Sequence, residues 1–366
     1  MASTHTYNFP AIRGIQATRE YYVAMCPLNI IPKLFSFDEE ESGLSAEVRA
    51  QRILNKGRIP ELARYITNNK EDYVFSAITA SINGKVKFEP LETKNIKNSL
   101  NGTLKVDMSA KLIINDGQHR RAAIEQAIKT EPDLADESIA VVFFIDKGLS
   151  KSQQMFSDLN RHAVKPSRSL GLLYDHRNDM AKISKLVALQ SEAFRGLVET
   201  ERSTLSERSQ KLFTLSAIYT GCQALLEPLK IKDYEESVKL CQDYWNSVAS
   251  QFNDWKLVRD SKISAGEIRK DKVHTHAISL QCFGIIGSQL QNTNGWKDIL
   301  TRLKDIDWSR SNAETWEGRI MQGGKISKTN SSVTLTVNIL KKYLGLELTE
   351  SEKKIEEAYL KKDGNE

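Results

Sequence analysis

The chain has 366 residues, of which 40% are hydrophobic and 27% charged, and its formal net charge is +5. At roughly 150 residues per domain, this length predicts about two domains, each large enough to bury a core of its own. The ordinary apolar content and modest net charge exclude an intrinsically disordered protein. No run approaches the ~20 apolar residues that a membrane span needs, so no membrane association is expected.

The N-terminal residues and the cysteines indicate the cellular compartment. Residues 1–16 contain no charged region followed by an apolar segment, so no secretory signal is expected. Cys26, Cys222, Cys241 and Cys282 are widely spaced and form no C-x-x-C pair. Because this spacing is typical of reduced thiols rather than of a disulfide framework, the sequence predicts a cytoplasmic protein.

The first part of the chain alternates between strand-like and helix-like runs. Residues 19–26 and 30–37 are rich in β-branched and aromatic side chains, which predicts strands. Apolar residues recur at helical spacing in residues 45–55 and 59–69, which predicts two helices.

A hairpin signal and a strand–helix–strand pattern follow. Asn83-Gly84 predicts a hairpin between a strand that ends there and a returning strand at residues 85–88. Residues 110–115 form a short apolar run, and residues 121–129 carry an apolar helical stripe. Residues 139–145 are apolar throughout, which predicts a strand buried on both faces. Strand, helix and strand together predict a βαβ unit.

From about residue 170 onward, helical periodicity is continuous and strand signals are sparse. The sequence therefore predicts an α/β domain at residues 1–170, followed by a mainly α-helical domain at residues 171–366. Near the C-terminus one helix is expected to stop at Gly345. The spacing Thr349-x-x-Glu352 is a capping box that predicts the start of a terminal helix.

The pentapeptide Asp116-Gly117-Gln118-His119-Arg120 joins the 110–115 strand to the helix that follows it. A tight turn at a helix start presents backbone N–H groups at the positive end of the helix dipole, which favours an anion. Gly117 lets a ligand approach the main chain, and Asp116 can act as N-cap or orient His119. The side chains of His119 and Arg120 can both donate to a phosphate. The alternative is an ordinary capped turn with an exposed His–Arg pair.

Other basic residues form candidate contacts to nucleic acid. Residues 151–170 carry four Lys or Arg side chains against one acidic residue. This segment is either a second phosphate-binding surface or the basic C-terminus of a helix. Basic residues are common at helix C-termini because the helix dipole favours positive charge there. For the basic residues near position 50, an ordinary solvated helix face is the alternative. The candidates are Gln51, Arg52, Arg58, Asn160, Arg161, Lys165 and Arg168.

The motifs together resemble the DGQHR-domain family, and most closely its members in bacterial DNA phosphorothioation (sulfur-modification) operons. The resemblance covers essentially the whole chain. The matching motifs, in chain order, are Gly14-Ile15-Gln16, Gln51-Arg52, Asp116-Gly117-Gln118-His119-Arg120, Phe156-x-x-x-Asn160 with Arg161, Trp316-x-Gly318-Arg319 and Gly324-Lys325-Ile326.

This resemblance implies a DNA-binding transcriptional repressor of the operon that encodes the sulfur-modification enzymes. Its partners would be double-stranded operator or promoter DNA and other sulfur-modification proteins. The resemblance also implies an N-terminal fold of the ParB/sulfiredoxin class, in which a Gly-x-x-Arg-type turn at a helix start holds nucleotide phosphates. Residues 116–120 correspond to that turn. Sulfiredoxin-like chemistry is not expected, because Gln118-His119 stand where that reaction needs a cysteine.

An enzymatic alternative remains open, because some members of that class hydrolyse nucleotides or nick DNA. In this interpretation His119 is the acid–base group, Asp116 orients it, and a nucleotide with Mg²⁺ is the ligand. Phosphate–metal chemistry usually needs two or three carboxylates, so Asp107 and Asp158 would have to converge on Asp116. No metal ligands are assigned, since His274-Thr275-His276 has a spacing that does not suit one helical face.

Overall fold

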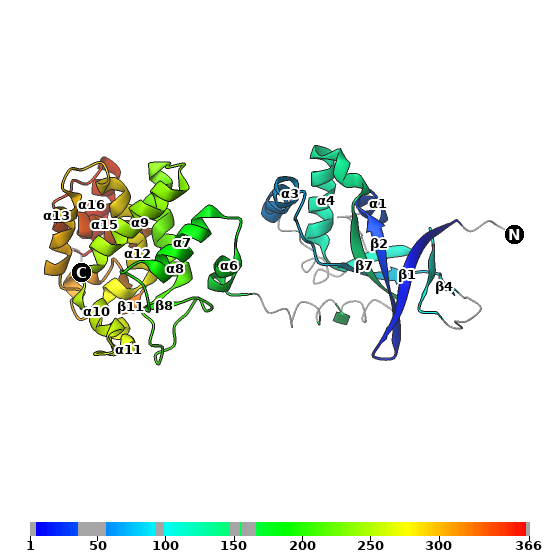
Figure 1. The fold of residues 1–366 in the computed structure, drawn as a ribbon, viewed down its shortest axis with the longest axis horizontal. Coiled ribbons are helices and arrows are strands. Elements are labelled where there is room, and N and C mark those ends of the chain that lie inside the picture. Colours follow the sequence, from blue (N-terminus) through cyan, green and yellow to red (C-terminus); the bar gives the residue numbers. More distant parts are fainter. Residues whose placement is uncertain are drawn as a thin grey trace. The chain divides into compact units, whose positions relative to one another are not determined.

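The computed structural model describes residues 5–35, 56–91, 99–145, 154–155, 158 and 166–363. The chain divides into two compact units, Met1–Val164 and Lys165–Glu366, and each has a hydrophobic core of its own (Figure 1). Within the described part of the chain, no helix combines the length and the apolar character needed to cross a membrane.

A mixed seven-stranded sheet forms the centre of the first unit, in the order β4-β5-β1-β2-β7-β3-β6. Neighbouring strands are antiparallel, except that β7 and β3 are parallel. The strands are β1 (Thr6–Gln16), β2 (Arg19–Pro27), β3 (Ile78–Asn83), β4 (Val86–Pro90), β5 (Asn101–Asp107), β6 (Lys111–Asp116) and β7 (Ser138–Ile145).

Three helices pack against this sheet: α1 (Ile31–Leu34), α3 (Ile59–Asn68) and α4 (Gln118–Thr130). Helices α3 and α4 lie side by side (Figure 1). Ile66 of α3 and Ile124 of α4 are buried in the same apolar cluster as Val141 and Phe143 of β7. This packing fixes the first turn of α4 at the end of β6, beside the start of α3.

Several local predictions for the first unit are confirmed, and one is wrong. Helices α3 and α4 and strands β2 and β6 form where the residue patterns place them. The segment 30–37 was expected to be a strand, but Ile31–Leu34 is a short helix with Pro32 in its first turn, a position that proline suits. The helix expected at residues 45–55 lies outside the described residues.

Strand pairing differs more from the sequence prediction. Strand β3 does not form a hairpin with β4, because β6 and β7 already occupy both of its edges, and β4 pairs with β5 instead. The predicted βαβ unit is also absent as such: β6 and β7 are separated by β3, and the parallel pair is β3 with β7. Strand β7 alternates between buried and partly exposed residues, so it is not buried on both faces.

The second unit is mainly helical, as the periodicity predicts, with two short strand pairs. Its helices are α6 (Arg168–Tyr174), α7 (Asp179–Gln190), α8 (Leu215–Leu226), α9 (Tyr234–Ala249), α10 (Asn253–Arg259), α11 (Ala265–Asp271), α12 (Ala277–Leu290), α13 (Trp296–Leu300), α14 (Ala313–Trp316), α15 (Asn330–Leu344) and α16 (Glu350–Asp363). Its strands are β8 (Val198–Glu199), β9 (Phe213–Thr214), β10 (Met321–Gln322) and β11 (Lys325–Ile326).

The centre of this unit is the contact between α8 and α12, which pack along their lengths. A Cβ atom on Gly284 would lie 2.2 Å from the carbonyl oxygen of Gly221, so this close approach requires glycine. The predicted capping box is confirmed at α16, where the Thr349 N–H donates to Glu352 and the Glu352 N–H donates to the Thr349 hydroxyl.

Candidate anion-binding site

The turn between β6 and α4 depends on a left-handed residue. Gly117 is the N-cap of α4 with φ of +110°, and a Cβ there would lie 3.1 Å from both Ile78 Cγ1 and Arg120 Nη2. Side-chain residues rarely adopt this conformation, whereas glycine adopts it freely. Gly117 provides no side-chain cap, and of the two roles left open for Asp116 the N-cap role is not the one that forms. The positive end of the helix dipole therefore lies at this turn without a side-chain cap from the N-cap residue.

Arg120 closes this turn instead of extending away from it. Its Nη2 lies 2.5 Å from Asp116 Oδ2, its Nη1 donates to the Ser76 hydroxyl, and its side chain is only 17% exposed. Arg120 therefore does not form part of an exposed His–Arg pair, which was the alternative considered for this turn. Among the described residues, the buried Nε of Arg120 and Oε1 of Gln118 have no hydrogen-bond partner. Both polar atoms sit in the turn itself. The Arg120 Nε is a donor and suits an anion, whereas the Gln118 Oε1 can only accept a hydrogen bond.

The structure brings Arg58 to the same place. Arg58 is exposed and is the N-cap of α3, at the end of a short 3₁₀ turn (Lys56–Arg58). Burial lowers the pKa of His119 below its ordinary value of 6.5, and the charges of Arg58 and Arg120 lower that pKa further, against the opposing effect of Asp116. His119 is therefore neutral near pH 7. Arg58, His119 and the uncapped start of α4 form one electropositive site.

Arg121, the residue after the pentapeptide, is a structural arginine that the sequence analysis did not identify. Its Nε donates to the Phe35 carbonyl at 2.9 Å and its Nη2 donates to the Pro32 carbonyl at 3.0 Å. Its Nη1 pairs with Glu125 at 2.5 Å. These bonds tie the first turn of α4 to α1. The available sequence signal was the i, i+4 spacing of Arg121 and Glu125, which is common on ordinary helices.

Asp107, one carboxylate of the enzymatic alternative, lies far from Asp116 in the sheet. Asp107 accepts hydrogen bonds from Ser109 at the end of β5, and four strands separate β5 from β6. At about 4.8 Å per strand step, this separation is roughly 24 Å. Asp158 accepts from Gln154 at 2.7 Å. The described residues hold no group of three or more His, Cys, Asp or Glu that could bind a metal ion.

The remaining nucleic-acid candidates are Arg168, in the second unit, and five residues that the structure does not describe. Arg168 begins α6 in the second unit, where it is exposed and its guanidinium lies 5.3 Å from the ring centre of Tyr219. The other candidates lie outside the described residues: Gln51, Arg52, Asn160, Arg161 and Lys165.

The C-terminal motif around Trp316 is structural. Trp316 is fully buried, and Arg319 pairs with Glu356 through contacts of 2.7 and 3.0 Å. Arg319 also donates to the Leu335 carbonyl and lies 4.4 Å from the ring centre of Tyr359. The Arg319 and Lys342 side chains hold the pKa of Glu356 at about 2, against the effect of its burial. This motif therefore joins α15 and α16 within the second unit.

Comparison with known proteins links the whole chain to one family. A family model described as DndB, DNA-sulfur modification-associated, matches residues 9–347 and so covers both units. No curated protein and no solved structure matches the chain.

We expect Arg121→Gln to lower the free energy of unfolding of the first unit by about 2–4 kcal/mol. The substitution leaves buried carbonyl groups without their charge-assisted donor. Arg64→Gln, which replaces an exposed arginine on α3, should change stability by less than about 0.5 kcal/mol. Urea denaturation of both variants measures the difference, and equal stabilities would show that the Arg121 contacts do not hold α4 in place.

Proposed function

The chain belongs to the DndB family of DNA-sulfur modification-associated proteins, and from this premise we propose that it is a DNA-binding transcriptional repressor of a sulfur-modification operon. The observation that carries the proposal is the convergence of Arg58, His119 and the uncapped start of α4. All three offer hydrogen-bond donors to an anion. Duplex DNA presents a regular line of phosphates that such a site can grip.

In the proposed complex, a phosphate oxygen accepts hydrogen bonds from the first-turn N–H groups of α4. The planar guanidinium group of Arg58 can donate hydrogen bonds to two phosphate oxygens at once. His119, on the same helix turn, donates a further hydrogen bond. Arg120 stays with Asp116 and keeps the turn in shape. Phosphate contacts of this kind set the position of a protein on DNA without reading its base sequence, so operator recognition requires further contacts.

We also propose that the first unit is a distant relative of the ParB/sulfiredoxin class, since Gly117 joins a strand to a helix at the point where that class holds phosphate. Double-stranded operator DNA is the proposed main partner, and other sulfur-modification proteins are further proposed partners. The hydrolase or nickase interpretation finds less support. The Asp116 carboxylate, which would orient His119, is paired with Arg120.

Arg58→Gln should weaken binding to duplex DNA by about ten- to hundredfold, because it removes one charge-assisted hydrogen bond. It should also reduce the slope of log K against log salt by roughly 0.9, the value for one phosphate contact, equally for operator and unrelated duplexes. Fluorescence anisotropy over a salt series measures both quantities. Arg64→Gln, an exposed change on the same helix, should leave the slope as it is.

Repression can be tested separately by measuring the expression of a reporter gene under the promoter of the chain's operon. The wild-type chain should lower reporter expression, and Arg58→Gln should restore it. An unchanged salt slope in folded Arg58→Gln would remove Arg58 from the DNA contact. Tight DNA binding without any effect on the reporter would contradict the repressor role.

Binding should also depend on pH through His119. Its imidazole is neutral near pH 7 because burial and Arg58 lower its pKa. A phosphate beside the ring would favour the protonated form and raise that pKa, so binding would take up a proton. The affinity for DNA should therefore increase as the pH falls from about 7.5 to about 5.5.

His119→Gln should remove this part of the pH dependence. His176→Gln replaces an exposed histidine of the second unit and should leave the profile unchanged. Identical pH profiles for the wild type and His119→Gln would show that His119 does not face the bound phosphate.

A further inference from the structure

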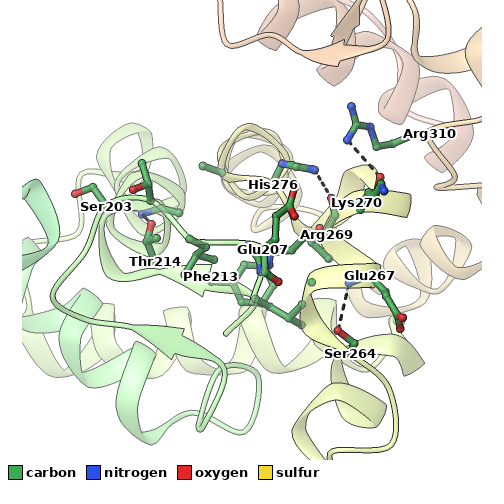
Figure 2. Close-up of a pocket in the computed structure, with 17 residues that line it drawn as sticks. Ser203, Glu207, Phe213, Thr214, Ser264, Glu267, Arg269, Lys270, His276 and Arg310 are labelled. Atoms are coloured by element: carbon green, nitrogen blue, oxygen red, sulfur yellow. Dashed lines mark hydrogen bonds between the residues drawn. The ribbon is translucent and has the colours of Figure 1, made fainter. Parts of the chain in front are cut away.

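A cavity of about 610 Å³ lies within the second unit, between the segment that leads into α8 and the starts of α11 and α12 (Figure 2). No residue that the sequence analysis singled out as a phosphate or DNA contact lines it. Its volume is in the range of about 300–1,000 Å³ that is typical of small-molecule sites. The lining includes charged, hydroxyl and apolar groups, and their arrangement indicates the chemistry of a ligand.

Cationic side chains gather on one side of the cavity. Arg310 donates to the carbonyl oxygens of Lys270 and Gly324, at 3.3 and 2.6 Å. Arg269 donates to the Ser206 carbonyl at 2.7 Å. In the described part of the chain, none of Arg269, Lys270 and Arg310 forms an ion pair with a carboxylate. Backbone carbonyl groups position Arg269 and Arg310, and Glu207 acts electrostatically on Arg269. Such a cluster favours an anionic group.

Two longer helices begin at the same wall. Thr214 is the N-cap of α8 and its hydroxyl accepts from the Ala217 N–H at 3.2 Å, so that helix is capped. His276 is the N-cap of α12 but provides no side-chain cap. Its Nε2 lies 3.0 Å from the Arg269 carbonyl oxygen instead. The uncapped start of α12 therefore adds a positive dipole end to the cationic side.

The opposite side of the cavity has a different character. In Figure 2, Ser203, Thr214 and Phe213 lie across the cavity from Arg310 and Lys270, and Glu207 lies between the two groups. The hydroxyl groups on this side and the Glu207 carboxylate are suited to the hydroxyl groups of a ligand body. A second lining carboxylate, Glu267, lies on the same side as Lys270, and both carboxylates would repel a bare inorganic anion. The cavity thus combines an anion-binding side with a polar side.

We propose that this cavity binds a small organic phosphate, with its phosphate at Lys270 and Arg310 and its hydroxyl groups toward Glu207. Nucleoside monophosphates and sugar phosphates share this chemistry. The site belongs to the second unit alone, so the proposal does not depend on whether the first unit binds DNA.

The test measures binding of AMP, ribose 5-phosphate, adenosine and inorganic phosphate to the full-length chain by calorimetry and thermal unfolding. AMP or ribose 5-phosphate should bind, and the two arms distinguish a nucleotide from a sugar phosphate. At a concentration about 100 times Kd, the ligand should raise the Tm of the second unit by roughly 5–10 °C. Adenosine, which lacks the phosphate, should give no rise, and inorganic phosphate should bind more weakly than the organic phosphates.

Lys270→Gln and Arg310→Gln should each weaken binding of the organic phosphate by about ten- to hundredfold. Lys270 is exposed, so its variant should fold even if loss of the Arg310 hydrogen bonds disturbs the other one. Lys304→Gln replaces an exposed lysine that does not line the cavity and should bind like the wild type.

Two results would overturn the proposal. One is that neither AMP nor ribose 5-phosphate binds. The other is binding that folded Lys270→Gln leaves unchanged but that Arg58→Gln abolishes, which would place the ligand at the start of α4 in the first unit.

Discussion

The left-handed backbone at Gly117 is the constraint on which the candidate DNA-binding site depends. It lets β6 turn directly into α4 without a side chain over the first helical turn. Arg120 can then lie against the glycine and pair with Asp116, and this ion pair stabilises the turn. Any Cβ at this position would meet both the Arg120 side chain and the wall of β3. The glycine backbone therefore leaves the start of α4 without a side-chain cap and also leaves room for the Arg120 side chain that stabilises the turn.

Two neighbouring arginines stabilise this turn through different contacts. Arg120 closes the turn locally through Asp116, and Arg121 ties the helix to the carbonyl groups of α1. The exposed cation of the site, Arg58, comes from a different helix and a distant part of the sequence. Because the two supporting arginines are held by intramolecular bonds, the start of α4 presents its backbone donors in a fixed geometry. Preorganised donors bind an anion without first losing conformational freedom.

The sequence predicted the features that local patterns determine. Helices α3 and α4, the capping box at Thr349 and the stop at Gly345 all follow from spacing within a few residues. Strand partners did not follow from such patterns, because β3 finds its neighbours β6 and β7 far along the chain. Sequence alone also could not separate the roles of the adjacent arginines, since helical geometry turns one toward Asp116 and the next toward α1. The cavity of the second unit had no local signal, as its lining comes from segments between residues 203 and 310.

Hydrogen–deuterium exchange of the full-length chain, with and without operator duplex, tests the central claim most directly. The backbone N–H groups that follow Gly117 would become hydrogen-bonded to phosphate in the complex, since Gly117 provides no side-chain cap for the helix start. We therefore predict slower exchange at residues 118–120 and around Arg58 when operator DNA is bound, with little change along the buried strand β7. Saturated DNA binding that leaves exchange at the first turn of α4 unchanged would contradict the account.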